Sequence, residues 1–292
     1  MLKRRALMGT LLGGGLLALL PSPGRAAAGT LPRPPVPPRR PPRPVGPLVM
    51  LDPGHGGKDP GTSTRDGLRE KTVTLAVALR LRRLLLAAGY RVVMTRSRDV
   101  FVSLHERVAM AERARPALFL SLHANWAHDP AVRGASAYTL GGAASDAQAE
   151  SVARLENGAG HTHARRRGLS RRLSRGLPLP PQVAPDPARR AESERFAAAL
   201  VAALDPDMTE LPGSVRRAAF AVLRSTARAS ALVEMGFLSS PRDTALLRAP
   251  AGQARVAADL AGAVGAYFRA APGVLAAAGH AAEEVPGQPP RD

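Results

Sequence analysis

From Pro47 onward the chain alternates short apolar runs with longer amphipathic segments, a pattern typical of an α/β domain. Runs rich in Val, Leu and Met predict four strands, at residues 48–52, 91–95, 117–123 and 230–235. Between the first two, apolar residues form a broad helix face from Val73 to Leu85, and Gly89 follows as a helix stop. This part of the chain therefore predicts a strand–helix–strand unit.

Further helices are predicted on either side of one irregular segment. Capping-box patterns, S-x-x-E from Ser103 and S-x-x-Q from Ser145, predict helices that end near residues 115 and 157. Alanine-rich segments predict two more, at residues 187–204 and 251–270. Residues 158–186 are rich in arginine and proline and have no sustained periodicity, so we expect a flexible basic insertion there.

The first 28 residues have the features of a signal peptide. A basic start precedes an apolar run of 15 residues, and the small residues "AAA" end at Ala28. Because a membrane span needs roughly 20 residues, we expect cleavage and a periplasmic or secreted protein. The pair Arg4 and Arg5 makes the twin-arginine route an alternative to the general one.

Two further segments are predicted to lie outside the folded domain. Residues 29–47 are dominated by proline, which favours an extended linker. Residues 271–292 have no periodic apolar pattern and predict a disordered tail. One domain of residues 48–270 remains between them, and we expect it to be monomeric.

The charge of the chain is unevenly distributed. The formal net charge is +18, and most of it lies on the signal peptide, the linker and the insertion rather than on the predicted core. Aromatic residues make up 3% of the chain, too few for base stacking, so we expect no nucleic-acid partner. An anionic envelope polymer or lipid surface suits the charge better. The absence of cysteine excludes disulfides and a lipoprotein anchor.

Three of the predicted strands contain or precede a polar residue whose side chain could bind a metal or take part in catalysis. His55 follows the first strand, His123 ends the third, and Glu234 lies in the fourth. In open α/β sheets the carboxyl ends of the strands form the ligand site, so the three could converge. Each histidine could instead be structural, but a carboxylate buried within "SALVEMGF" needs a metal or another cation beside it.

A fourth residue completes a candidate metal site. Glu70 opens the long helix, where it either interacts with the helix dipole or serves as a ligand. With His55 and His123 it makes a His2Glu set with an open position, which is the arrangement of catalytic zinc. Glu234 could then act as general base on a bound water. This donor set predicts amide hydrolysis.

Five ordered segments carry a resemblance to a known family. "LDPGHGGKDPG", "REKTVTLAVALRL", "MTRSRDVFVSLHERVAMA", "ALFLSLHAN" and "ALVEMGFLSSPRD" resemble the zinc-dependent N-acetylmuramoyl-L-alanine amidases that cut the septal cell wall. The resemblance covers residues 48–270 apart from the insertion. It implies a mixed, mostly parallel sheet of about six strands flanked by helices, with peptidoglycan as substrate.

The resemblance also implies the roles of the site residues. One zinc per chain is held by His55, Glu70 and His123, and Glu234 is catalytic. The bond that is cut joins the lactyl group of N-acetylmuramic acid to the L-alanine of the stem peptide. Two other readings stay open: a catalytically silent wall-binding scaffold, and a zinc peptidase or deacetylase that acts on another amide.

The regulation of the site is less well defined. Several family members insert a helix whose acidic residue covers the zinc until an envelope activator protein displaces it. The insertion of this chain predicts no such helix. Either regulation is lost, which predicts unregulated basal activity, or Glu150 or Glu156 on the preceding helix has a related role. Arg107 and Asn125 are expected to support the site or the fold.

Overall fold

The computed structural model describes residues 46–158, 186–204, 215–225 and 227–270. The expected signal peptide, the linker up to residue 45, the interior of the insertion and the tail lie outside these residues. No helix in the described part of the chain is long and apolar enough to cross a membrane.

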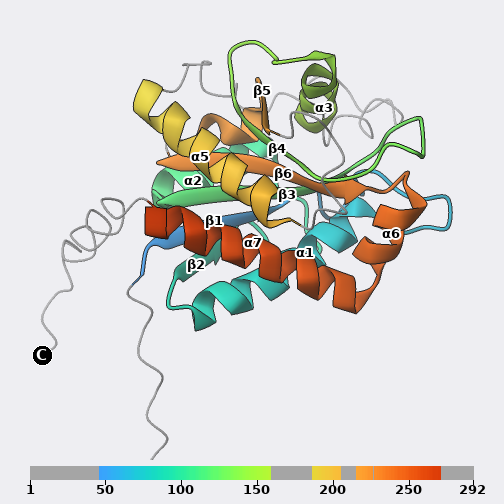
Figure 1. Ribbon diagram of the computed structural model, residues 1–292, viewed down its shortest axis with the longest axis horizontal. Coiled ribbons are helices and arrows are strands. Elements are labelled where there is room, and N and C mark those ends of the chain that lie inside the picture. Colours follow the sequence, from blue (N-terminus) through green and yellow to red (C-terminus); the bar gives the residue numbers. More distant parts are fainter. Residues whose placement is uncertain (1–45, 159–185, 205–214, 226, 271–292) are drawn as a thin grey trace, which may run out of the picture. The chain divides into compact units, whose positions relative to one another are not determined.

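A mixed sheet forms the centre of the domain (Figure 1). Among the described residues it has six strands in the order β2-β1-β3-β6-β4-β5. β4 is antiparallel to β6, and all other neighbouring strands are parallel. This confirms the expected fold class. The strands are β1 (Leu48–Pro53), β2 (Arg91–Met94), β3 (Leu118–Asn125), β4 (Ser136–Leu140), β5 (Val215–Ala218) and β6 (Ala229–Phe237).

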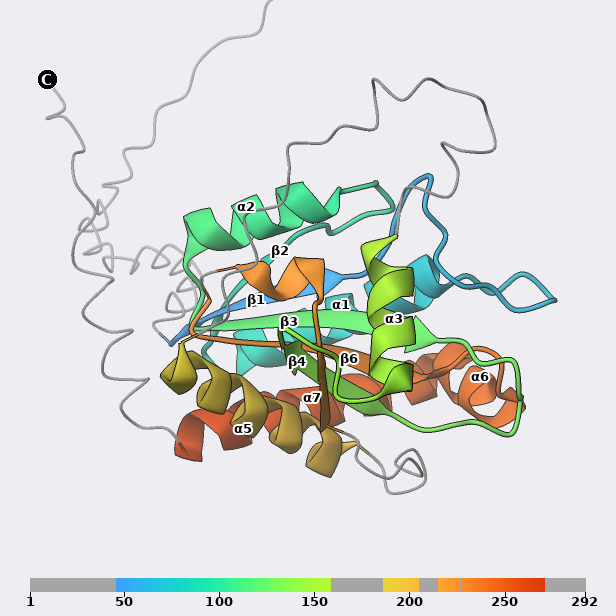
Figure 2. The ribbon, with the colours of Figure 1, turned by 90° about the horizontal axis from the view of Figure 1, so that it is seen from above.

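Helices cover both faces of the sheet (Figure 2). One face packs against α1 (Glu70–Ala87), α5 (Pro187–Ala203) and α7 (Pro250–Ala270), which share the larger apolar core. The other face packs against α2 (Leu104–Ala114), α3 (Ala147–Asn157) and the short 3-10 helix η2 (Ala221–Arg224), around a smaller core. Every residue of the central strands β3 and β6 is buried, and most of these residues are apolar, as expected for strands that are covered on both faces.

The four predicted strands are present, and besides the short η2 the described residues add three elements that the sequence analysis did not predict. β4 reads "SAYTL" and β5 reads "VRRA", and neither is a strongly apolar run. β5 is one of the two edge strands, where charged side chains face solvent without cost. The third is α6 (Pro241–Arg248), which has only 8 residues and begins with a proline at its first position.

One predicted helix start is correct and one is off by a residue. Ser103 and Glu106 form the expected capping box of α2. For α3 the predicted cap Ser145 was wrong, because the side chain of Asp146 accepts the backbone N–H of Ala149 instead. Aspartate and serine cap helices about equally well, so the pattern alone does not choose between neighbouring candidates.

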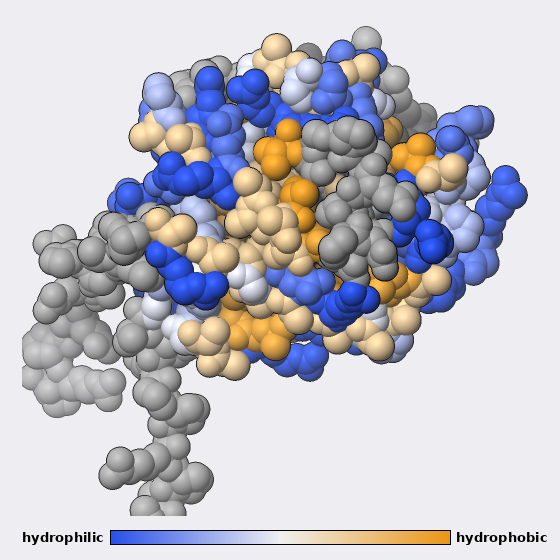
Figure 3. All heavy atoms as spheres, in the orientation of Figure 1, coloured by the Kyte–Doolittle hydropathy of each residue, from blue (hydrophilic) through white to orange (hydrophobic). Residues whose placement is uncertain are grey.

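The face seen in Figure 3 is hydrophilic around its rim and apolar at its centre. The central area coincides with α5 and α7 in the same view, which agrees with the alanine-rich sequences of these helices.

Candidate metal centre

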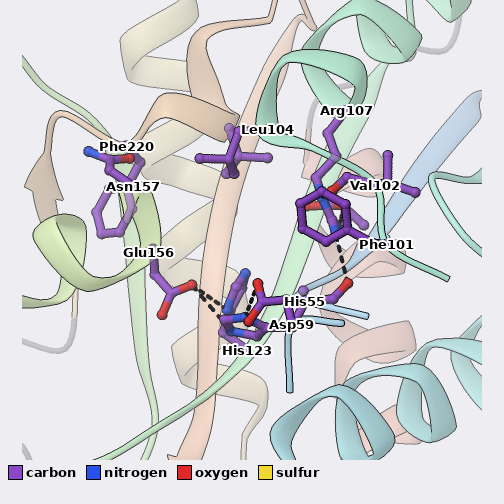
Figure 4. Close-up of a pocket in the computed structure, with 13 residues that line it drawn as sticks. His55, Asp59, Phe101, Val102, Leu104, Arg107, His123, Glu156, Asn157 and Phe220 are labelled. Atoms are coloured by element: carbon purple, nitrogen blue, oxygen red, sulfur yellow. Dashed lines mark hydrogen bonds and ion pairs between the residues drawn. The ribbon is translucent and has the colours of Figure 1, made fainter. Parts of the chain in front are cut away.

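Four side chains meet at the carboxyl ends of the central strands, and Figure 4 shows His55, His123 and Glu156 among them. His55 lies two residues beyond β1, His123 lies near the end of β3, and Glu70 is the first residue of α1. One potential ligand atom from each of these, and one from Glu156 on α3, all lie within 4.8 Å of one another. The three ligands expected from the sequence are therefore brought together, and a fourth carboxylate joins them.

Glu70 is the centre of this cluster. Its Oε1 lies 3.0 Å from His55 Nε2 and 3.1 Å from His123 Nδ1. Backbone N–H groups hold the carboxylate in place: Ala124 donates to Oε1 at 3.0 Å and Thr62 donates to Oε2 at 2.9 Å. With 1% of its surface exposed, Glu70 is fixed from two sides and faces both imidazoles.

His55 is oriented by a second carboxylate. Asp59 Oδ2 lies 3.0 Å from His55 Nδ1, which leaves Nε2 facing Glu70. A carboxylate behind a histidine commonly fixes the ring and its tautomer in metal sites. The sequence analysis missed Asp59, since an aspartate in a turn four residues after a histidine carries no distinctive pattern.

Two glycines leave room for the ligands. A Cβ on Gly54 would lie 2.3 Å from Cε1 of the His123 ring, and a Cβ on Gly61 would lie 2.4 Å from Glu70 Oε2 and 2.6 Å from His55 Cδ2. Any side chain at either position would push a ligand out of place. Gly54 and Gly61 thus let the backbone pass close to the ligand side chains.

Glu156 covers the site, which the sequence analysis left undecided between two glutamates. Its Oε2 lies 2.9 Å from His123 Nδ1 and 3.5 Å from His55 Nε2. Glu150 is on the same helix but points to solvent and pairs with Arg154. Of the two alternatives that the sequence left open, the geometry favours a covering glutamate, which comes from the last turn of α3 rather than from the insertion that follows it.

Hydrogen bonds hold α3 in this position at both ends. The Asn157 amide donates to Ala219 O at 2.9 Å and accepts from Ala221 N at 2.7 Å, directly beside Glu156. At the start of the helix, Arg216 on β5 donates to the capping Asp146 at 2.9 Å and to Gln148 at 3.2 Å. These contacts tie the helix to β5 and to the segment before η2.

The carboxylates make the site favourable for positive charge. Burial disfavours the protonated imidazoles, but Glu156 and Glu70 outweigh it and raise the pKa of His123 to about 10. The pKa of His55 is also raised well above its usual value, again against burial and because of these two carboxylates. Burial would raise the pKa of Glu70, but the two histidines lower it instead.

The donor set fits a metal ion. His55 Nε2 and Glu156 Oε2 are buried atoms without a hydrogen-bond partner among the described residues. Imidazole nitrogens and carboxylate oxygens at this spacing suit zinc, which binds four such ligands. His55, Glu70 and His123 would hold the ion, with Glu156 in the remaining position.

Glu234 lies beside the cluster without belonging to it. On β6 it is directly opposite His123 in the parallel register with β3, and only 1% of its surface is exposed. Its Oε2 has no hydrogen-bond partner among the described residues. Burial raises its pKa well above 4.5, and the carboxylates of Glu156 and Glu70 add to the rise. A buried carboxyl group near, but outside, a ligand set suits proton transfer.

A pocket of about 400 Å³ opens onto the cluster. His55, Asp59 and His123 lie on one side of it, and Glu156 points toward them from α3 (Figure 4). The opposite wall is largely apolar and comes from the segment before α2 and from the neighbourhood of η2, with Phe101, Val102, Leu104, Phe220 and Val222. A substrate in this pocket would meet charged ligands and an apolar wall.

The two predicted supporting residues are both buried. Arg107 donates to Asp52 and to the backbone around His55. Asn125 accepts the N–H of Trp126 at 2.7 Å through its side chain, and its backbone oxygen accepts the N–H of Leu238 at 2.8 Å. Asn125 thus fixes the turn that follows β3.

Comparison with known proteins places the chain in one family. A family model described as N-acetylmuramoyl-L-alanine amidase matches residues 49–266. The amidase AmiC of Neisseria meningitidis serogroup B is 35% identical over 224 residues, which span 76% of this chain and 53% of the relative. AmiA of Salmonella typhimurium is 33% identical over 222 residues, 76% of each protein. The chain therefore spans about half of the first relative and three quarters of the second.

Solved structures agree with the sequence matches. The catalytic domain of the amidase CwlV from Bacillus (Paenibacillus) polymyxa var. colistinus has a TM-score of 0.56 at 27% identity, over 76% of this chain and 98% of that one. The amidase AmiC2 of Nostoc punctiforme has a TM-score of 0.55 at 28% identity, over 76% and 97%. The family model, the relatives and the solved structures agree, and the chain belongs to the N-acetylmuramoyl-L-alanine amidase family, as its resemblance implied.

Proposed function

We propose that this protein is a zinc-dependent enzyme that hydrolyses the amide bond between N-acetylmuramic acid and L-alanine in peptidoglycan. The observation that carries the proposal is the buried cluster of two imidazoles and a carboxylate, with the unpartnered carboxyl group of Glu234 beside it. Its substrate lies in the cell envelope, which fits the basic, apolar start of the chain and a periplasmic or secreted location. A role in wall remodelling or daughter-cell separation follows.

Each residue has a defined task in this proposal. His55, Glu70 and His123 would hold one zinc ion, which when bound would supply Lewis-acid chemistry that lowers the pKa of a water to about 7 and polarises the substrate carbonyl. Glu234 accepts the proton of the attacking water and returns it to the leaving amine. Its raised pKa supports this role, because a group that both takes and gives a proton works best near the operating pH.

We further propose that the conformation described here is a resting state. The Glu156 side chain lies where a water and the substrate carbonyl would need to be, 2.9 Å from His123 Nδ1. Hydrolysis then requires α3 to move away, and an envelope activator protein that binds this helix would promote the movement. The basic linker and insertion would favour contact with anionic envelope polymers or lipids, with the enzyme acting as a monomer.

Analysis of the reaction products tests the proposal. The mature chain is incubated with purified peptidoglycan, and the soluble products are identified by mass spectrometry, with zinc measured on the same protein. Free stem peptides that begin with L-alanine are expected, with one zinc per chain. Glycan fragments that keep their peptides, or release of acetate, would contradict the amidase assignment and favour another hydrolase.

A further inference from the structure

We propose that Arg96 and Arg107 are positioning residues of the metal centre, which hold the backbone around His55 in the conformation that metal binding needs. Arg96 follows β2 and Arg107 lies on α2, so neither belongs to a ligand-bearing element. The inference rests on the proposed function, because it assigns both residues a role toward the bound zinc.

The backbone at His55 needs such support. His55 has φ of 57°, in the left-handed region that residues other than glycine seldom adopt. Gly56 and Gly57 follow with φ of 125° and 57°. β1 has ended at Pro53, so the sheet no longer holds the carbonyl groups of this turn. The first metal ligand is therefore placed on a backbone that would relax unless other groups fixed it.

The two guanidinium groups bind three consecutive carbonyl oxygens in this turn. Arg96 donates from Nε to Pro53 O at 2.9 Å and from Nη2 to Gly54 O at 2.7 Å. Arg107 donates from Nη1 to Pro53 O at 2.8 Å and from Nη2 to His55 O at 2.7 Å (Figure 4). Together they fix the orientation of each peptide group on the way into His55.

Arg96 also connects this turn to the second ligand. Its Nη2 lies 3.0 Å from Lys71 O, in the first turn of α1, next to Glu70. The same nitrogen lies 3.1 Å from Thr74 Oγ1, whose hydroxyl donates to Gly54 O at 3.0 Å. One guanidinium group thus sets the distance between the helix that carries Glu70 and the turn that carries His55.

The charges show that these arginines are more than a buried ion pair. Asp52 is 2.5 Å from Arg107 Nη1 and receives further hydrogen bonds from Thr95 and Ser121. Arg96 is equally buried, with 3% of its surface exposed, yet its hydrogen bonds end on backbone carbonyls and a hydroxyl. Burying the charge of Arg96 without a directly bonded carboxylate costs free energy. Its planar guanidinium group, which binds the adjacent carbonyls of Pro53 and Gly54, explains why an arginine is found here.

Zinc affinity tests this role. The full chain and its Arg96→Lys and Arg107→Lys variants are titrated with zinc in competition with a chromophoric chelator. Lysine keeps the charge but cannot bind two carbonyls as a fork. We expect zinc to bind about 10- to 100-fold more weakly in both variants, as for other residues behind metal ligands. Arg91→Lys is the matched control, because Arg91 donates to a single remote carbonyl, Gly46 O, at 3.0 Å.

The thermal midpoint of each zinc-free variant separates positioning from general stability. Lysine variants that bind zinc as tightly as the wild type would overturn the inference, whatever their stability. If the lysine variants do not fold, Thr74→Val decides, since it keeps both arginines but removes the hydrogen bonds of the Thr74 hydroxyl to Gly54 O and to Arg96 Nη2. Weaker zinc binding by this variant supports the inference, and unchanged binding overturns it. A wild-type protein that binds no zinc would instead refute the proposed function.

Discussion

Removal of the Glu156 carboxylate should activate the enzyme. Glu156→Ala deletes the contacts of 2.9 Å to His123 and 3.5 Å to His55 while leaving the other three ligands in place. The carboxylate side chain is 13% exposed, so solvent screens these contacts only weakly. A hydrogen bond that involves a charged group contributes about 1.5–3 kcal/mol. Since 1.4 kcal/mol is a factor of ten, the uncovered state should become roughly 10- to 100-fold more populated.

The assay follows the release of stem peptides from purified peptidoglycan at limiting substrate, so that the rate reports kcat/KM. Glu150→Ala is the matched control, because Glu150 is one helical turn and a half earlier on α3 and pairs only with Arg154 at the surface. Zinc content is measured for both variants. We expect Glu156→Ala to release peptides 10- to 100-fold faster than the wild type, with Glu150→Ala unchanged.

A zinc-loaded Glu156→Ala protein that is no faster than the wild type would refute the reasoning. In that case Glu156 would be a structural ligand, and the covered conformation would not limit the reaction. Equal activation by Glu150→Ala would point to loosening of α3 as a whole rather than to the carboxylate.

Four further predictions concern individual residues. Glu234→Ala should keep zinc and lose hydrolysis, and normal turnover would remove Glu234 from the mechanism. His55→Ala should lose zinc while far-UV circular dichroism stays close to that of the wild type. Asn157→Ala removes two hydrogen bonds of about 0.5–1.5 kcal/mol each, so peptide release should rise roughly 5- to 100-fold. Burial would raise the pKa of Asp52, but Arg107 and hydroxyl donors hold this pKa below 3.8. The stability that the ionised Asp52 carboxylate contributes is therefore complete above pH 3.8 and is lost as the pH falls through the lowered pKa. Zinc-free Asp52→Asn should thus be less stable by about 3–5 kcal/mol in urea at pH 7, with a difference that shrinks only below pH 3.8.

Apart from β4, the sequence predicted the strands that are buried on both faces, because such burial favours a largely apolar run. β3 and β6 are examples, and their polar residues His123 and Glu234 stood out against that background. β5 was not predicted, because the edge position tolerates Arg216 and Arg217 and leaves no apolar pattern. The predicted N-cap of α3 was one residue too early, because serine and aspartate, here Ser145 and Asp146, are both favoured N-cap residues.

The sequence by itself determined the fold class and the family and predicted the three candidate ligands, since each depends on local patterns or on ordered segments. Only the tertiary structure decided which glutamate covers the site, because Glu150 and Glu156 lie on the same helix and only its packing shows that the last turn, not the first, meets the cluster. It also revealed Arg96 and Asp59 as partners of His55 and its turn. Such contacts depend on how separate elements pack against each other, and local patterns in the amino-acid sequence do not specify that packing.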